Sequence, residues 1–533
     1  MALSTVRGDL VVVLHAHLPF VRHPEHAYHL EENWLYEAIA ATYLPLLEML
    51  RSLVREGVPF RLTLSMSPTL CTMLRDDLLK MRAAAYLDRL LRLGEQEQRR
   101  TAGDATFGPL ARFYSERFSR LKALYDEIHG DIVGAYAALQ DAGHLEIITV
   151  AATHGYLPVI REPSARRAQL QVAVRHYRDC FGRYPRGIWL PECGYADGVD
   201  QLLADLDLRY FFMDAHGITH ARPRPPLGLH APIFTPSGVA AFGRDLESSK
   251  QVWSAQEGYP GDGCYRDFYR DVGFDRPLEE IGPFIHPDGI RVHTGYKYYR
   301  VTGPHVDLAD KQPYDPAAAQ ARALEHARNF VFNRKQQVEW LAQQMDRRPV
   351  IVSPYDAELF GHWWFEGPDF LGHVCREVAQ PGSTIRLSTA DEYLRDYPVN
   401  AVCEPSPSSW GDGGYSAVWI DGSNDWIYRH VHRAEVVMQR LAERFQREPL
   451  NDLQRRALNQ MARELLLAQS SDWAFIMKAG TAVRYAVDRL KSHLSRFRRL
   501  QRELESGQID AAWLADVESR DNIFPDIDFR VYA

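Results

Sequence analysis

The chain has 533 residues, of which 46% are hydrophobic and 25% are charged, and 62 basic against 70 acidic side chains give a net charge of −8. These values are ordinary for a globular protein, so they exclude wholesale disorder and a fibrous repeat. Since there is no basic surplus, nucleic acid is not expected as the main partner.

The cysteines and the amino-terminal segment bear on the compartment. The six cysteines are scattered and form no C-x-x-C pair, which does not support a zinc ribbon or a redox motif. Sparse cysteines of this kind suit reduced thiols. The first apolar run, Leu10–Leu14, is too short for a signal peptide or a membrane span. We therefore expect a cytoplasmic protein with no membrane segment.

Short apolar runs rich in β-branched or aromatic residues predict buried strands along the chain. They cover residues 9–14, 60–66, 145–151, 187–190, 209–213, 251–253 and 350–352, with 385–388 as one more candidate. Longer helical patterns over residues 34–56, 161–181 and 317–347 separate several of them. This alternation predicts an α/β fold with a parallel sheet, and seven or eight strands favour a closed barrel over an open sheet.

Two regions interrupt the alternation and predict helical additions. Residues 75–142 are rich in Arg, Leu and Glu and are too long for a simple crossover, so we expect a helical insertion within a catalytic domain of residues 1–400. Residues 401–533 carry amphipathic patterns and predict a C-terminal helical domain. The Pro- and Gly-rich stretch 222–243 is expected to be irregular.

Polar and titratable side chains follow nearly every predicted strand. In an α/β barrel the carboxyl ends of the strands meet on one face, where active sites lie, so these side chains are expected to share one pocket. The residues concerned are His15, His17, Ser65, Ser67, His154, Glu192, Asp214, His216 and Asp356.

Glu192 and Asp356 are the catalytic candidates from the residues alone. Glu192 directly follows Pro191, and Asp356 precedes the aromatic cluster Phe360–Phe365. Two carboxylates in an aromatic pocket fit glycosidic bond cleavage, in which one attacks and the other transfers a proton. Two alternatives stay open: a metal-dependent hydrolase in which His15, His17, His154, His216 and Asp356 are the ligands, and a glycan-binding protein without catalysis.

At these residues the chain resembles glycoside hydrolase family 57, and more closely its glucan branching enzyme group. The resemblance covers nearly the whole chain. It is carried by the segments LHAHLPF (14–20), GIWLPE (187–192), YFFMDAH (210–216), SPYDAELFGHWW (353–364) and SDWAF (471–475).

The resemblance implies a (β/α)7 barrel with an inserted helical subdomain and a C-terminal all-helical domain. It further implies a retaining reaction on α-1,4-glucan without metal or other cofactor, with Glu192 as nucleophile and Asp356 as general acid/base. The substrate-binding residues implied are His15, His17, His154, Trp189, Asp214, His216, Trp253, Trp363, Trp410, Trp419, Asp472 and Trp473.

One segment departs from the branching group. There, a flexible loop after the YFFMDAH strand carries a tyrosine that helps to cover the site, whereas residues 217–244 contain no tyrosine. A cover over the active site is important for branching, because water must be kept from the covalent glycosyl-enzyme until the acceptor chain binds. Hydrolysis of α-1,4-glucan, or 4-alpha-glucanotransfer, is thus the alternative within the family, and Phe234 or Tyr259 is a candidate replacement cover.

Overall fold

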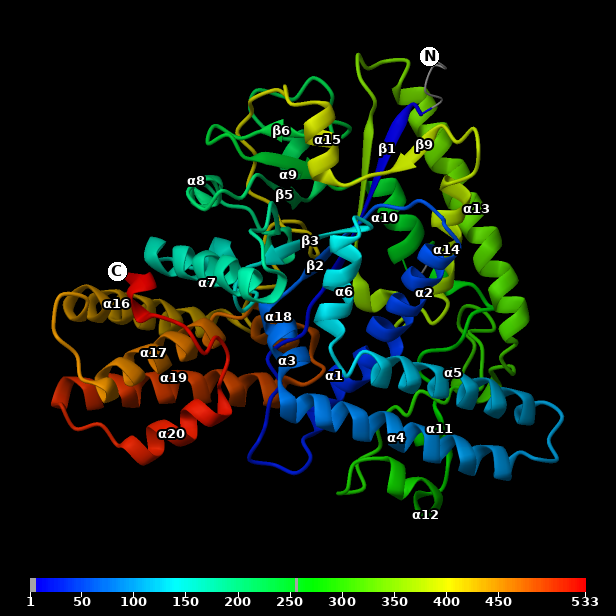
Figure 1. The fold of residues 1–533 in the computed structure, drawn as a ribbon, viewed down its shortest axis with the longest axis horizontal. Coiled ribbons are helices and arrows are strands. Elements are labelled where there is room, and N and C mark those ends of the chain that lie inside the picture. Colours follow the sequence, from blue (N-terminus) through cyan, green and yellow to red (C-terminus); the bar gives the residue numbers. More distant parts are fainter. Residues whose placement is uncertain (1–5, 255–256) are drawn as a thin grey trace.

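The computed structural model describes residues 6–254 and 257–533 and contains a central sheet with helices packed around it (Figure 1). The strands are β1 (Gly8–Ala16), β2 (Leu62–Met66), β3 (Leu145–Val150), β4 (Gly187–Trp189), β5 (Tyr210–Met213), β6 (Ile233–Phe234), β7 (Ala240–Gly243), β8 (Val350–Asp356) and β9 (Ile385–Leu387). The order is β6-β7-β5-β4-β3-β2-β1-β8, and β9 also pairs with β1. All pairs are parallel except the β6–β7 hairpin.

The sheet curls toward a barrel, as the alternation of strands and helices predicted. Between its outer strands β7 and β8 there is no continuous ladder among the described residues. The gap is bridged by backbone hydrogen bonds, in which Asp245 N–H donates to Val352 O over 2.8 Å and Val350 N–H donates to His230 O over 2.9 Å. The strands are buried throughout most of their length, which explains why they read as continuous apolar runs.

One predicted strand is wrong, and two strands, β6 and β7, were missed. Residues 251–253 end helix α10 (Leu246–Trp253), whose first turn is capped by the Asp245 side chain accepting from Ser248 N–H. The strand at this place in the sheet is β7, inside the stretch expected to be irregular. Its sequence, Ala-Ala-Phe-Gly, has no β-branched residue, yet its burial and its pairing with β5 fix it as a strand.

Helices surround the sheet on its outer side. They are α1 (Asn33–Ala38), α2 (Leu44–Arg55), α3 (Pro68–Arg75), α7 (Pro163–Phe181), α8 (Val199–Ala204), α9 (Ala215–Thr219), α10, α13 (Pro316–Leu341), α14 (Gly367–Val378) and α15 (Ala390–Asp396). The short helices α11 (Val272–Asp275) and α12 (Leu278–Ile281) lie away from the sheet, beside the helical insertion (Figure 1). A π-helical turn, Ile39–Tyr43, joins α1 to α2.

Between β2 and β3 the chain forms α4 (Asp77–Arg100), α5 (Phe107–Glu127) and α6 (Ile132–Asp141), so the region expected to be helical is helical. The long helices α4 and α5 lie side by side and extend away from the sheet at the lower right of Figure 1. Tyr114 of α5 donates to Lys297 O, and Tyr296 donates to Leu90 O of α4, which joins the insertion to residues 265–300.

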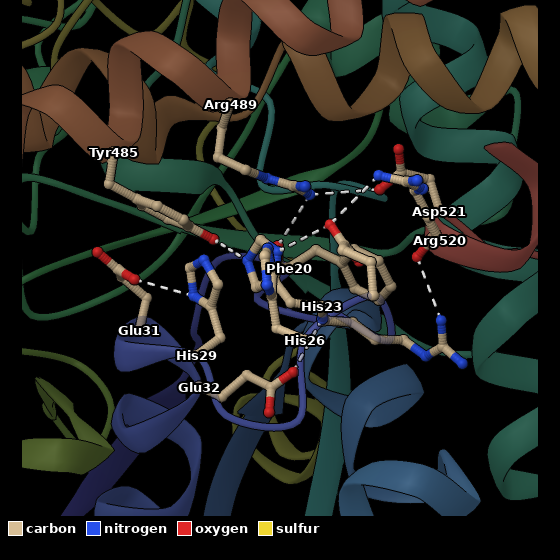
Figure 2. A network of polar contacts seen from close by, with 12 residues as sticks. Phe20, His23, His26, His29, Glu31, Glu32, Tyr485, Arg489, Arg520 and Asp521 are labelled. Atoms are coloured by element: carbon tan, nitrogen blue, oxygen red, sulfur yellow. Dashed lines mark hydrogen bonds and ion pairs between the residues drawn. The ribbon is translucent and has the colours of Figure 1, made fainter. Parts of the chain in front are cut away.

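The C-terminal region is also helical. It contains α16 (Tyr428–Phe445), α17 (Asp452–Ala468), α18 (Ser471–Ala479), α19 (Val483–Ser506) and α20 (Ala511–Arg520), grouped at the left of Figure 1. Figure 2 shows how α19 contacts the loop that follows β1: Tyr485 hydrogen-bonds His23 over 2.8 Å, and Arg489 reaches both Phe20 O and Asp521. These buried contacts join the two ends of the chain.

Candidate active site

Glu192 is held in an unusual backbone conformation at the end of β4. Its φ is +61° and its ψ is +24°, a left-handed conformation that costs a residue with a side chain of order 1–3 kcal/mol. The Glu192 carbonyl accepts from Trp410 N–H over 2.9 Å. Its side chain accepts from Trp410 Nε1 (2.9 Å) and Ser471 Oγ (3.1 Å). The surroundings therefore compensate the strain and fix the carboxylate in one direction.

Asp356 is the last residue of β8 and is aligned with His15 of the adjacent strand β1. Residues so aligned on neighbouring parallel strands point to the same face of the sheet. No hydrogen-bond donor contacts the Asp356 carboxyl group within the described part of the chain. Burial first, and then the nearby carboxylates Glu358 and Glu192, raise the pKa of Asp356 well above its ordinary value.

The two carboxyl groups thus differ in their donors. Burial raises the pKa of Glu192 to about 7, but its bonds from Trp410 and Ser471 favour the ionised form. Asp356 has no comparable donor, so the proton is retained more readily by Asp356. A nucleophile must be ionised and a general acid must be protonated, and this difference matches those two roles.

Three of the four histidines expected to bind sugar form one cluster beside the carboxylates. His15 contacts Ser65 Oγ over 3.1 Å and His154 over 3.0 Å, and its ring stacks on Trp189 at 5.0 Å. His17 stacks on His154 at 3.8 Å. Burial lowers the pKa of both His15 and His154 well below the ordinary value, so these two rings are neutral.

The C-terminal helix α18 completes this cluster. His17 Nε2 lies 3.0 Å from Asp472, and Ser471 Oγ lies 2.7 Å from His154 Nδ1. Burial opposes the charge on His17, but Asp472 outweighs it, so the pKa of His17 is raised and that of Asp472 is lowered. The result is a His17–Asp472 ion pair across 455 residues of sequence.

Asp214 and His216 follow β5 on the other side of Glu192. Asp214 pairs with Arg244 Nη2 at 3.0 Å and with His216 Nδ1 at 3.2 Å, and His216 Nε2 lies 2.7 Å from Gly414 O. Gly414 is needed here because its φ is +76°, and because a Cβ atom at this position would lie only 2.8 Å from the His216 ring. Arg244, directly after β7, is a site residue that the sequence reasoning missed.

The expected tryptophan platforms divide into exposed and buried rings. Trp363 is 53% exposed and stacks on Phe268, and Trp253 is 68% exposed at the end of α10 rather than at a strand end. Trp410 is half-buried beside Glu192.

Three others cannot stack on a sugar in this conformation, which corrects that expectation. Trp189, Trp419 and Trp473 are at most 1% exposed. Trp189 supports His15, Trp419 stacks on Tyr156 at 4.8 Å, and Trp473 donates to Leu467 O. They support the site from beneath, because their faces are covered by protein.

Sequence reasoning also left out a third carboxylate. Glu358 is two residues beyond Asp356 and accepts from Tyr43 Oη over 2.5 Å and from His17 N–H over 3.2 Å. Burial raises its pKa to about 7. The sequence could have indicated Glu358 as a site residue, because it lies in the aromatic-rich segment after β8. No sequence pattern indicated Tyr43, which lies in the π-helical turn.

The metal-ligand alternative is not supported by the geometry. The nitrogens of His15, His17 and His154 are bonded to serines, to Asp472 or to each other, so they do not converge on one point. Among the described residues, the one grouping of three ligand atoms is Glu464, His493 and Asp521 in the C-terminal helices. There Arg489 and Arg496 already pair with Asp521, which leaves no charge for a cation to neutralise.

Two buried carboxyl groups at strand ends, flanked by imidazoles and indoles, define a carbohydrate-active enzyme that uses a pair of acids. The comparisons agree. The model of glycosyl hydrolase family 57 matches residues 11–404, and a model described as 1,4-alpha-glucan branching enzyme, C-terminal, matches residues 430–532. The chain belongs to glycosyl hydrolase family 57.

Some of the similar proteins are described as branching enzymes, and one is described as an amylase. A 1,4-alpha-glucan branching enzyme of Thermococcus kodakarensis is 34% identical over 97% of this chain and 78% of its own length. The crystal structure of the alpha-amylase AmyC of Thermotoga maritima is 44% identical with a TM-score of 0.93 and covers 99% of both chains. A branching enzyme of Pyrococcus horikoshii is 34% identical with a TM-score of 0.89, covering 99% of this chain and 97% of that one.

The tyrosine-free segment 217–244 is tied to the chain that follows β9. Arg222 and Glu404 exchange two backbone hydrogen bonds, and Phe234 exchanges two with Ala401 and Cys403. Phe234 therefore lies in a hairpin, while Tyr259 packs on His326 and donates to Asn329. An exposed tyrosine lies elsewhere: Tyr415 contacts the His216 ring at 4.9 Å.

Proposed function

We propose that this protein is a retaining 1,4-alpha-glucan branching enzyme. It cleaves an α-1,4 linkage, holds the glucan on Glu192 and transfers it to a 6-hydroxyl group of an acceptor chain. The observation that carries the catalytic assignment is the difference in hydrogen-bond donors: among the described residues, two donate to the Glu192 side chain and none donates to that of Asp356. The branching assignment is supported by the match of residues 430–532 and by the names of the relatives.

In the first step, Asp356 donates its proton to the glycosidic oxygen while a Glu192 oxygen attacks the anomeric carbon. The C–O bond to the leaving chain breaks as the bond to Glu192 forms. Asp356, now ionised, then removes the proton of an acceptor hydroxyl group, which displaces Glu192 and restores both carboxyl groups. His15, His17, His154, Asp214 and His216 are proposed to bind the hydroxyl groups of the sugar held at Glu192.

Hydrolysis is the second candidate, and two observations favour it. Residues 217–244 contain no tyrosine, and the amylase AmyC shares 44% of its residues with this chain. One observation argues against hydrolysis. Tyr415 contacts the His216 ring and is 58% exposed, so its side chain is free to rotate and cover a bound sugar from the side of the C-terminal region. We propose Tyr415 as the cover that excludes water.

The deciding experiment is incubation with amylose, followed by proton NMR of α-1,6 linkages and an assay of new reducing ends. Branching produces α-1,6 linkages with few new reducing ends, whereas hydrolysis produces reducing ends alone. Tyr415→Phe and Tyr415→Ala sharpen the test: loss of the ring should raise the ratio of hydrolysis to transfer, and loss of the hydroxyl group alone should change it less. The exposed Tyr184 supplies the matched control, Tyr184→Ala.

The partner we propose is an α-1,4-glucan such as amylose or a glycogen-like chain. We also propose a cytoplasmic location, which is supported by the absence of disulfide bonds among the six cysteines. No described helix has the length and apolar composition needed to cross a membrane. We further propose that residues 1–400 form the catalytic unit with 75–142 inserted, and that residues 401–533 form the unit that supplies Trp410, Ser471 and Asp472 to the site.

A further inference from the structure

A small cavity lies between the helical insertion and the segment that follows β8, and its lining is mostly apolar with several charged side chains among it. Its volume is about 40 Å³, and its lining residues include Glu37, Arg117, Arg266, Phe268, Lys297 and Phe365. A water molecule needs roughly 10–15 Å³ of such space, so the cavity holds a few water molecules or one small ion but no sugar ring. It shares no lining residue with Glu192, Asp356 or the histidine cluster.

Two arginines in this cavity have no carboxylate partner. Arg117 of α5 and Arg266 lie over the same Phe365 ring, at 4.4 Å and 4.2 Å from its centre. Neither forms an ion pair among the described residues, although arginines elsewhere in the chain commonly do. Arg266 is 7% exposed, and its Nε, like Arg117 Nη2, is buried without a hydrogen-bond partner.

This arrangement is unfavourable unless something else occupies the cavity. A buried guanidinium group without a counter-charge carries a desolvation cost of several kcal/mol, and two such groups close together also repel. Burial lowers the pKa of Arg117, although the nearby carboxyl groups of Asp369 and Glu48 act in the opposite direction. Proteins normally remove such a cost by pairing the group with an acid. Among the described residues, Asp369 and Glu48 act on Arg117, and Glu366 acts on Arg266, but none of these acids lies within ion-pair distance of the guanidinium group.

The remaining polar groups of the cavity add a third cation and few anions. Lys297 is 3% exposed and pairs with Asp271 at 3.3 Å. Burial raises the pKa of Glu37 to about 8, so Glu37 is mostly protonated at neutral pH and is able to donate a hydrogen bond. Burial also lowers the pKa of His362 to about 3, which leaves that ring neutral. Glu366 is close to Arg266, but its pKa is raised to about 7 by burial.

From these contacts we propose that the cavity binds a phosphate group, either as inorganic phosphate or as part of a phosphorylated sugar. The planar guanidinium groups of Arg117 and Arg266 would each donate to its oxygens, as such groups do in bidentate recognition of oxyanions. Lys297 supplies a point charge and Glu37 a neutral donor. For a sugar phosphate, the sugar would extend toward the Phe268–Trp363 pair, whose rings stack at 4.4 Å.

The consequence reaches the catalytic segment. His362 and Phe365, which line the cavity, belong to the same stretch as Asp356 and Glu358. A bound phosphate would neutralise the two cations that contact the Phe365 ring, and it would stabilise this stretch. The site is thus a candidate effector site, and it is independent of whether the glucan chain is transferred or hydrolysed.

Calorimetric titration of the full-length protein tests the proposal, at constant ionic strength in a buffer without phosphate or sulfate. Sodium phosphate, glucose 6-phosphate, glucose and sodium chloride are compared. Binding of one phosphate per chain, at least about tenfold tighter than chloride, is expected. Tighter binding of glucose 6-phosphate than of phosphate identifies a sugar phosphate as the ligand, and Trp363→Ala should then remove only that advantage. Phosphate binding no tighter than chloride overturns the proposal.

Variants place the binding in this cavity. Arg117→Gln and Arg266→Gln should each weaken phosphate binding about tenfold or more, and Arg266→Lys should weaken it less because the charge remains. Arg112→Gln, at an exposed position of the same helix, is the matched control. Thermal unfolding gives a second readout, in which each protein is compared with and without phosphate, so a variant that is less stable overall is still informative. Phosphate should raise the unfolding midpoint of the wild type and of Arg112→Gln, but not of Arg117→Gln. Equal shifts in all three variants would refute the assignment.

Discussion

The base of the candidate active site and its rim are built differently. At the base, hydrogen bonds and stacked rings join five side chains, which come from β1, from the segments just after β1, β3 and β4, and from α18. They are His15, His17, His154, Glu192 and Asp472. At the rim, Trp363 and Tyr415 are more than half exposed and contact one or two other rings each.

This difference separates chemistry from selection. Groups that stabilise a transition state must be held before the substrate arrives, because any reorganisation during the reaction costs activation free energy. Rings that bind a long polymer need only offer a flat apolar face, so they tolerate exposure and movement. Changes at the base should therefore reduce kcat, and changes at the rim should alter KM or the product ratio.

The largest effect is expected from Glu192→Gln. It removes the attacking oxygen anion while retaining size and burial, so turnover of amylose should fall more than about 1,000-fold. Glucan binding, measured by affinity electrophoresis, should change little. The matched control is Glu404→Gln at an exposed position, and near-normal activity in Glu192→Gln would exclude Glu192 as nucleophile.

A smaller loss is expected from Asp472→Asn. His17 keeps its bond to Ser67 but loses its charged partner, and a hydrogen bond to a charged group contributes about 1.5–3 kcal/mol. We expect kcat to fall roughly 10- to 100-fold with little change in KM. Asp488→Asn, on an exposed face of α19, is the control, and an equal loss in both variants would contradict a specific role for Asp472.

Trp410→Phe should mainly shift the pH profile. The indole N–H favours the ionised form of Glu192, whose pKa is about 7, so its loss must raise that pKa further. Because Glu192 must be ionised to attack, the acidic limb of kcat/KM should move to higher pH, by up to about one unit. Trp340→Phe provides an exposed control on α13, and an unchanged acidic limb in Trp410→Phe would show that the indole does not act on Glu192.

The smallest effect is expected at the rim, from Trp363→Ala. Loss of one stacking surface should raise KM for amylose about three- to tenfold and leave kcat nearly unchanged. Trp340→Ala, which also removes an exposed indole, should leave both constants unchanged. A large fall in kcat in Trp363→Ala would remove the distinction between base and rim.

Sequence patterns predicted the fold where burial dictates residue type. Strands such as β1 and β8 contain runs of valine and isoleucine because both of their faces are covered. Strand β7 could not be found in this way, since small residues suffice where β5 packs closely beside it. The three apolar residues 251–253 were misread as a strand because so short a run does not distinguish a strand from one face of a helix.

The site was predictable in part. Glu192, Asp356 and the histidines follow strands, so their convergence follows from the parallel sheet. The partner Tyr43 was not predictable, because it lies hundreds of residues from Glu358 and in no recognised motif. Ser471 lies in the SDWAF segment that the resemblance marked, but its contact with Glu192 could not be foreseen from that segment. Nor does composition tell an open indole from a covered one: Trp363 is exposed and Trp419 is buried, although both follow glycine-containing segments.

The ion pair between His17 and Asp472 has a consequence for the growing chain. Its two members are separated by 455 residues, so at synthesis rates of about 5–20 residues per second, the second is added roughly 20–90 seconds after the first. Until α18 leaves the ribosome, Glu192 lacks the Ser471 donor and His17 lacks its counter-charge. If these residues act as proposed, we expect the nascent chain to be inactive toward glucan until nearly nine-tenths of the protein has been made.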